Sequence, residues 1–276
     1  MIQLVQFELK KIWRSTYFKW LLFLLVITVL AFYAYTYANT VSIDTIFEWQ
    51  QEGQNDPVIK EYMLTLIGIV YFLFLFTDIV TKEGYYRNGP IQLLRSQPTK
   101  RYQILLVKLF TILFISLAII GLILGLVTLL GLFFPNSVHW DNPILIYGES
   151  YPLTFAAIGL FLLKSLSLFF MLLLFSYSLL FLYSALTNRA FISLILTIIT
   201  LFSGIQLVAQ SFSFKFTQWI PFHYVNVFQI ISNEYVLRHG QDSISYINGL
   251  LSLLTGSVIV LLLTLIVSKL KQGVVR

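Results

Sequence analysis

The chain has 276 residues, of which 58% are hydrophobic and 11% charged, and its mean hydropathy is +0.84. A water-soluble domain of this composition would lack the polar surface needed to cover its core, so the composition indicates an integral membrane protein. No cysteine occurs in the sequence, which excludes disulfides, thiol catalysis and cysteine-based metal sites. The net charge of +6 is interpreted as attraction to anionic lipid rather than to nucleic acid.

The first 19 residues predict an amphipathic helix that lies in the membrane surface. Apolar residues recur at helical spacing on one face, and polar or basic residues occupy another. The apolar face holds Ile2, Val5, Leu9, Ile12 and Trp13, and the polar face holds Gln3, Gln6, Lys10 and Arg14. The alternative interpretation is a basic flank that only sets the topology of the first span.

Six apolar segments are long enough to cross a hydrocarbon core of about 30 Å as helices. They lie near residues 20–38, 62–80, 104–134, 153–186, 190–210 and 247–269. The third and fourth exceed the roughly 20 residues that a span needs, so we expect them to tilt, protrude or contain a break. These continuous runs of Leu, Ile, Phe and Val lack the alternation of barrel strands, so the sequence predicts an all-α integral membrane protein with six transmembrane helices in one domain, 1–276.

The distribution of charge predicts the orientation of these spans. Lys and Arg are concentrated before the first span, between the second and third, between the fourth and fifth, and after the sixth, whereas Asp and Glu predominate in the other loops. Basic loops stay in the cytoplasm, so we expect a multi-pass protein whose N-terminus and C-terminus are both cytoplasmic.

Several polar side chains inside the apolar segments are candidates for a pathway through the membrane, namely Tyr33, Tyr37, Lys164 and Tyr177. An interior of this kind, with hydroxyl groups and almost no fixed charge, favours an amphipathic or hydrophobic cargo over a small ion. The tyrosines could equally form ordinary hydrogen bonds between helices. Counting back from Arg189, Lys164 falls near the outer interface, where its stem can reach toward the headgroups.

The outer segment 211–246 is rich in aromatic residues, which suits an interfacial or partly re-entrant pair of short helices broken at Pro221. Its candidate outer-gate residues are Trp219, Pro221, Phe222, Tyr224 and Asn226. An aromatic belt that anchors the protein is the alternative. The histidines His139, His223 and His239 fall in outer loops and are interpreted as surface or interfacial residues. Catalytic motifs are missing, so we expect no enzymatic activity, cofactor or metal on this chain.

The basic stretch 83–101 predicts a short cytoplasmic helix that another protein grips. Pro90 suits the first helical position, and Pro98 ends the helix about two turns later. Ile91, Leu93 and Leu94 offer a small apolar face, which Arg87, Arg95, Lys100 and Arg101 surround with charge. The turn Asn188-Arg189 is a second candidate contact. A basic connection without a partner is the alternative.

The stretch resembles the cytoplasmic loop of ABC-2 type permeases, the membrane subunits of ATP-binding-cassette exporters. The resemblance rests on Glu83, Gly89, Leu93, Leu94, Pro98, Arg101 and Lys108, with Pro90 in place of the usual Thr. A second resemblance is the run from Trp219 to Asn226, which is similar to the Pro-Phe-x-Tyr-x-Asn element before the last span of that family.

The resemblance implies a type V exporter-like subunit in the bacterial plasma membrane. It implies two cytoplasmic ATPase subunits, which carry ATP and Mg²⁺, and a second copy of this chain or a related permease. The expected function is export of a membrane-active peptide such as an antimicrobial peptide, a lipid-like molecule or a drug. The alternative is a non-transporting membrane sensor or immunity protein that binds an external peptide.

Overall fold

The computed structural model describes residues 2–38, 65–77, 101–133, 144–146, 149–151, 155–187, 189–210, 219–225, 227 and 246–273, with only the backbone at some helix ends. Its helices are α1 (Ile2–Arg14), α2 (Thr16–Ala38), the helix Thr65–Thr77, α6 (Arg101–Phe133), α7 (Phe155–Thr187), α8 (Ala190–Gln210), the short 3-10 helix η3 (Pro221–Val225) and α11 (Tyr246–Gly273). Strands β1 (Ile144–Ile146) and β2 (Glu149–Tyr151) form one short antiparallel pair. The described chain is helical apart from this pair.

Each of the six predicted spans coincides with a helix, but the helices differ in length. Three stretches are long and apolar enough to cross a membrane: Gln103–Leu126, Leu163–Thr187 and Tyr246–Leu270. The bent pair α1 and α2 would supply a fourth span if it crosses as one unit. The apolar stretches Thr65–Thr77 and Ala190–Gln206 are shorter. The described residues therefore hold three or four candidate spans, and the count of six stays a prediction.

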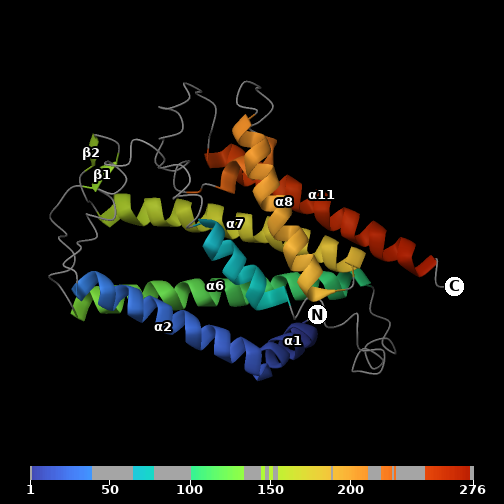
Figure 1. Ribbon diagram of the computed structural model, residues 1–276, viewed down its shortest axis with the longest axis horizontal. Coiled ribbons are helices and arrows are strands. Elements are labelled where there is room, and N and C mark those ends of the chain that lie inside the picture. Colours follow the sequence, from blue (N-terminus) through green and yellow to red (C-terminus); the bar gives the residue numbers. More distant parts are fainter. Residues whose placement is uncertain are drawn as a thin grey trace.

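The long apolar segments are single unbroken helices. α6 and α7 each run for 33 residues, which corresponds to about 50 Å of helix. The possibility of a break is thereby excluded, and tilt or protrusion remains. Both helices follow the longest axis of the molecule (Figure 1). α1, the turn from α7 into α8 and the C-terminal end of α11 lie toward the same end of the molecule (Figure 1).

The N-terminal helix is shorter than predicted and is separated from the first span by a sharp bend. α1 ends at Arg14, α2 begins at Thr16, and the two helices meet at an angle of 70°. The Phe18 N–H donates to Ser15 Oγ at 3.4 Å, so Ser15 caps the start of α2. A polar cap at Ser15 thus ends the interfacial helix before residue 19.

The predicted apolar face of α1 is divided between two surroundings. Ile12 is 1% exposed and Glu8 is also buried, and α1 packs against α6, whereas Trp13 is 68% exposed. Lys11 Nζ lies 3.8 Å from Glu8 Oε2, which offsets part of the cost of burying that carboxylate. Packing against another helix, rather than apolar pattern alone, therefore selects the inward face.

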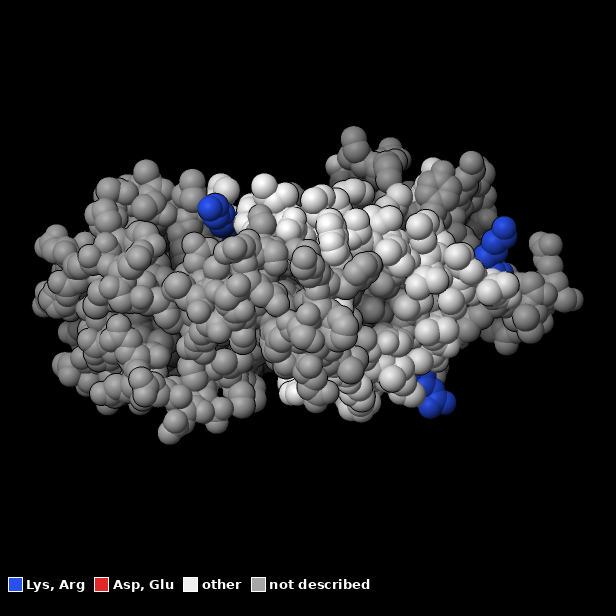
Figure 2. All heavy atoms as spheres, turned by 90° about the horizontal axis from the view of Figure 1, so that it is seen from above, with Lys and Arg blue, Asp and Glu red and all other residues white. Residues whose placement is uncertain are grey.

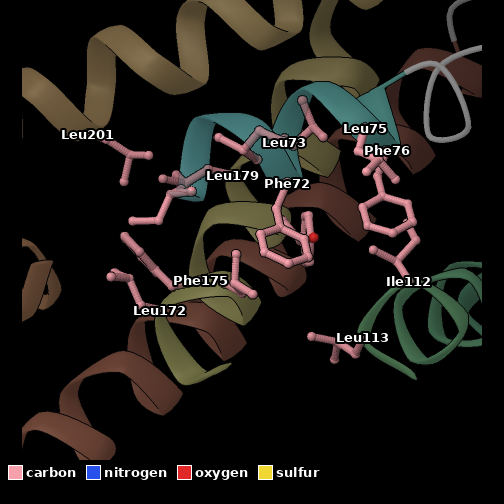
Figure 3. Close-up of a cluster of buried hydrophobic side chains, with 14 of the residues drawn as sticks. Phe72, Leu73, Leu75, Phe76, Ile112, Leu113, Leu172, Phe175, Leu179 and Leu201 are labelled. Atoms are coloured by element: carbon pink, nitrogen blue, oxygen red, sulfur yellow. The ribbon is translucent and has the colours of Figure 1, made fainter. Parts of the chain in front are cut away.

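The core lies between the helix Thr65–Thr77, α6, α7 and α8. Phe72, Leu73, Leu75 and Phe76 of the first helix meet Ile112 and Leu113 of α6, Leu172, Phe175 and Leu179 of α7, and Leu201 of α8 (Figure 3). The helix Thr65–Thr77 buries most of its side chains in this cluster. Its side chains thus lie in the core beside those of α6, α7 and α8 (Figure 3).

The described outer surface is apolar. Exposed large side chains include Phe110, Phe114 and Leu117 on α6, Phe191, Ile195 and Ile199 on α8, and Ile247, Val258 and Leu262 on α11. On the face drawn in Figure 2, the described surface is almost entirely uncharged, with isolated basic side chains. A continuous apolar exterior of this kind would be unfavourable in water and suits the hydrocarbon of a bilayer.

Candidate functional site

Most residues predicted to contact an ATPase lie outside the described residues. These are Glu83, Arg87, Gly89, Pro90, Ile91, Leu93, Leu94, Arg95, Pro98 and Asn188. Arg101 begins α6, and Arg189 is exposed in the turn between α7 and α8. The prediction of a coupling helix therefore stays a prediction. The described residues include the helices on both sides of this segment, Thr65–Thr77 and α6.

The chain enters the connection 78–100 from a helix that is firmly held. The Tyr71 hydroxyl donates to the Leu21 carbonyl of α2 at 2.7 Å. The Phe76 ring contacts the ring of Tyr177 on α7 edge to face, with centroids 5.7 Å apart. Both contacts involve the helix Thr65–Thr77, and the chain leaves the connection directly into α6. A force on residues 78–100 would thus reach α2, α6 and α7.

The turn that carries Arg189 is fixed by hydroxyl groups. Ser193 Oγ donates to the Arg189 carbonyl at 2.7 Å and lies 2.8 Å from Thr187 Oγ1. The Arg189 N–H donates to Thr187 Oγ1 at 3.4 Å. These bonds satisfy polar groups at the start of α8 and hold the backbone of the turn. Arg189 is therefore presented from a rigid α7–α8 hairpin.

The segment Pro221–Val225 forms a wedge that packs on α7, α8 and α11. Tyr224 and Val225 are buried, and the Phe222 ring meets the ring of Phe175 edge to face at 5.5 Å. Ser252 Oγ of α11 donates to the Trp219 carbonyl at 2.9 Å. Burial raises the pKa of Tyr224 to about 12, so this phenol stays neutral at physiological pH. We refer to Pro221–Val225 as the outer wedge.

Three glycines make room for the outer wedge, and we call them the glycine slots. An added Cβ would collide with the Phe222 ring at Gly204, lie 2.7 Å from Tyr224 Cδ1 at Gly249, and lie 2.6 Å from Pro221 Cγ at Gly256. Gly204 belongs to α8 and the other two to α11. The sequence interpretation missed them, although Gly249 and Gly256 are seven residues apart and so share a helix face. Gly121 and Gly125 of α6 have no such neighbour within 4 Å.

The predicted outer-gate residues fall in or beside the wedge. Pro221, Phe222 and Tyr224 belong to it, Trp219 precedes it and is half exposed, and Asn226 lies outside the described residues. His223 is buried instead of lying on the surface, so that part of the prediction is wrong. The error arose because its apolar neighbours carry the histidine into the helix bundle. His139 and His239 lie outside the described residues.

Tyr177, a predicted pathway residue, is fully buried between helices of this chain. Its exposed fraction is 0%, and its hydroxyl lies 2.9 Å from Ser116 Oγ of α6. This is the geometry of a hydrogen bond between helices, the alternative that the sequence left open. Tyr33 and Tyr37 belong to the last turns of α2, and their side chains lie outside the described residues.

Lys164 is the tenth residue of α7 and lies near Tyr246, the first residue of α11. Its Nζ is 5.8 Å from the ring centroid of Tyr246, and the Tyr246 hydroxyl lies 2.5 Å from Ser167 Oγ. A lysine over an aromatic ring that begins a membrane helix is typical of a membrane interface. The position favours an interfacial role over a contact at mid-membrane.

Replacing Lys164 by Gln is expected to lower the free energy of unfolding by no more than about 1 kcal/mol, the size of an exposed cation–π contact. Thermal unfolding in detergent measures this change. Transport in reconstituted vesicles is expected to stay close to that of the unmodified chain. A tenfold loss of transport at unchanged stability would show that Lys164 lines the pathway instead.

Within the described residues, no three His, Asp or Glu side chains come together as metal ligands would. The geometry there offers a buried wedge, packed helices and hydrogen bonds between helices. No protein-family model, no curated protein and no solved structure matches the chain.

Proposed function

We propose that this chain is the membrane-spanning permease subunit of a bacterial ABC exporter of the ABC-2 type. Two cytoplasmic ATPase subunits would bind ATP and Mg²⁺, and a second copy of this chain or a related permease would complete the pathway in the plasma membrane. The cargo would be hydrophobic or amphipathic: a membrane-active peptide, a lipid-like molecule or a drug.

The observation that carries the proposal is that the helices on both sides of the connection 78–100 are packed in the core. This connection follows the buried helix Thr65–Thr77 and precedes α6, and it lies between two helices that the hydrophobic core holds. Such supports would allow the segment to transmit mechanical work, because a force is transmitted only through elements that do not yield.

The proposed mechanism couples closure of the ATPase pair to the helix bundle. Closure would push the predicted helix around Leu93 and Leu94 and the turn at Arg189. The first push would reach α2 and α7 through Tyr71 and Phe76, and the second would act on the α7–α8 hairpin. α7 receives both and also packs on the outer wedge, so it links the two ends of the molecule.

The apolar character of the described interior supports the proposed class of cargo. The core is formed by Leu, Ile and Phe, with hydroxyl groups of Ser, Thr and Tyr between them and few charges. A small ion would require a lining of charges or ordered carbonyls. An amphipathic molecule requires mainly apolar contact with a few hydrogen bonds.

Changing Leu93 and Leu94 together to Asp is expected to abolish binding of the ATPase, because two charges would replace the apolar anchor of the contact. The measurement is a pull-down of the chain in mild detergent, expressed with its genomic neighbours and assayed for a bound ATPase. Gln92→Asp is the matched control, since it places an acidic residue at a polar position of the same predicted helix.

A stoichiometric ATPase on the unmodified chain and on Gln92→Asp, but not on the double variant, would support an exporter permease. An ATPase retained by the double variant would refute the coupling helix. Failure to recover any ATPase with the unmodified chain would refute the exporter proposal and favour the membrane sensor or immunity protein.

A further inference from the structure

The bend between α1 and α2 carries a surface of aromatic and basic side chains that the transport proposal does not use. We call it the elbow surface and define it by Phe7, Lys10, Trp13, Arg14, Lys19 and Trp20, all of which are exposed. The 70° bend turns α1 far from the direction of α2. If α2 crosses the membrane, α1 lies close to the membrane plane.

The fold turns these side chains outward because the other face of α1 is occupied. Glu8 and Ile12 are buried, and α1 packs on α6. Phe7, Lys10 and Arg14 recur at spacings of three and four residues, so they share the opposite face. Packing on α6 therefore determines which face of α1 points outward. That face carries both basic and aromatic side chains.

The charges on the elbow surface are not neutralised by the described part of the chain. Lys11 forms an ion pair with Glu8, in which Lys11 Nζ lies 3.8 Å from Glu8 Oε2. Among the described residues, no carboxylate forms an ion pair with Lys10, Arg14 or Lys19. The surface therefore presents three cations to whatever covers it.

The exposed tryptophans indicate what that partner is. Trp13 and Trp20 are 68% and 66% exposed. An indole ring is most stable at the boundary between hydrocarbon and headgroups, where its ring is apolar and its N–H finds a hydrogen-bond acceptor. Lys and Arg beside it reach the phosphates of the same layer. A soluble acidic protein would satisfy the cations but would not supply hydrocarbon for the rings.

From this geometry we infer that the elbow surface binds the headgroups of anionic phospholipids and concentrates them around α1. The binding does not depend on an ATPase or on a cargo. Each Lys or Arg near an anionic membrane favours the bound state by about fivefold, which for three fully additive cations would be on the order of a hundredfold, so a preference of at least several-fold over zwitterionic lipid is expected.

The experiment uses the full chain in lipid nanodiscs with Trp13 as its only tryptophan, after Trp20, Trp49, Trp140 and Trp219 are changed to Phe. The discs contain the same mixture of phosphatidylglycerol and phosphatidylcholine, and one lipid or the other is brominated. Quenching of Trp13 fluorescence then reports which headgroup class lies beside the elbow. We expect several-fold stronger quenching by brominated phosphatidylglycerol, weakening as sodium chloride is raised.

The variant Lys10→Gln/Arg14→Gln/Lys19→Gln is expected to lose this preference. The matched control, Lys269→Gln/Lys271→Gln/Arg276→Gln, removes the same charge elsewhere and is expected to keep it. Size-exclusion chromatography verifies that both variants remain folded. Equal quenching by the two lipids in the single-tryptophan chain that keeps all three cations would overturn the inference. So would a preference that survives in the elbow variant, or one that disappears in the control. None of these outcomes bears on ATPase binding.

Discussion

Replacing Gly204 by Ala is expected to lower the free energy of unfolding by about 1 to 3 kcal/mol, the range for overpacked cores. The added methyl group would overlap the Phe222 ring close to its attachment to the backbone, so a simple rotation of the ring would not relieve the clash. Gly249→Ala is expected to act in the same direction, since Tyr224 is fully buried and lies 2.7 Å from the new atom. Both substitutions would push the outer wedge away from its slots.

Gly121→Ala provides the matched control. It is the same substitution in a long helix, but no neighbour lies within 4 Å of the new atom, and glycine is exposed there. Removing a glycine from a helix is expected to stabilise it by up to about 1 kcal/mol. Thermal unfolding followed by tryptophan fluorescence compares the variants. If Gly204→Ala and Gly121→Ala unfold at the same temperature, the outer wedge is not held by the glycine slots.

Replacing Tyr177 by Ala is expected to produce the largest loss of stability that we predict, about 3 to 5 kcal/mol. The ring is fully buried, meets Phe76 edge to face at 5.7 Å and connects α7 to the helix Thr65–Thr77. Its removal would leave a cavity at the centre of the bundle. Unfolding in detergent by heat measures the loss.

Tyr177→Phe separates the ring from its hydroxyl. Ser116 Oγ also donates to the Ile112 carbonyl at 2.9 Å, so it keeps a partner when the Tyr177 hydroxyl is removed. The expected cost is therefore only about 0.5 to 1.5 kcal/mol. A Phe variant as unstable as the Ala variant would contradict this ranking. A stable Phe variant that no longer transports would return Tyr177 to the list of pathway residues.

The existence of the helices could be predicted from the sequence, because long apolar runs must satisfy their backbone groups internally. Their limits depend on single polar residues. Ser15 ends α1 early by capping α2, and a pattern of apolar residues does not reveal such a cap. The face of α1 that packs on α6 could not be predicted, because it contains Glu8, a carboxylate whose burial depends on Lys11 and on the tertiary fold.

Only part of the candidate site could be predicted from the sequence, because some of its contacts depend on the tertiary fold. The break at Pro221 follows from the lack of an N–H on proline, and the structure begins η3 there. The glycine slots could not be identified, because the role of Gly204 depends on Phe222, which follows it in sequence but reaches it only through the tertiary fold. The predicted coupling residues around Leu93 lie outside the described residues, so that part of the site rests on the sequence.

The unbroken length of α6 and α7 has a mechanical consequence. Tilted by 40°, the upper end of the usual range, a helix of about 50 Å would still rise about 38 Å, more than the hydrocarbon thickness. Residues 127–133 of α6 and 155–162 of α7 are mainly apolar, so the surplus length at this end is apolar as well. α6 ends and α7 begins at the same end of the molecule (Figure 1), so tilting the two helices as one unit would move both of these ends together. A pivot of about 5° at the opposite end would swing their tips by about 4 Å, enough to open or close a gap one side chain wide.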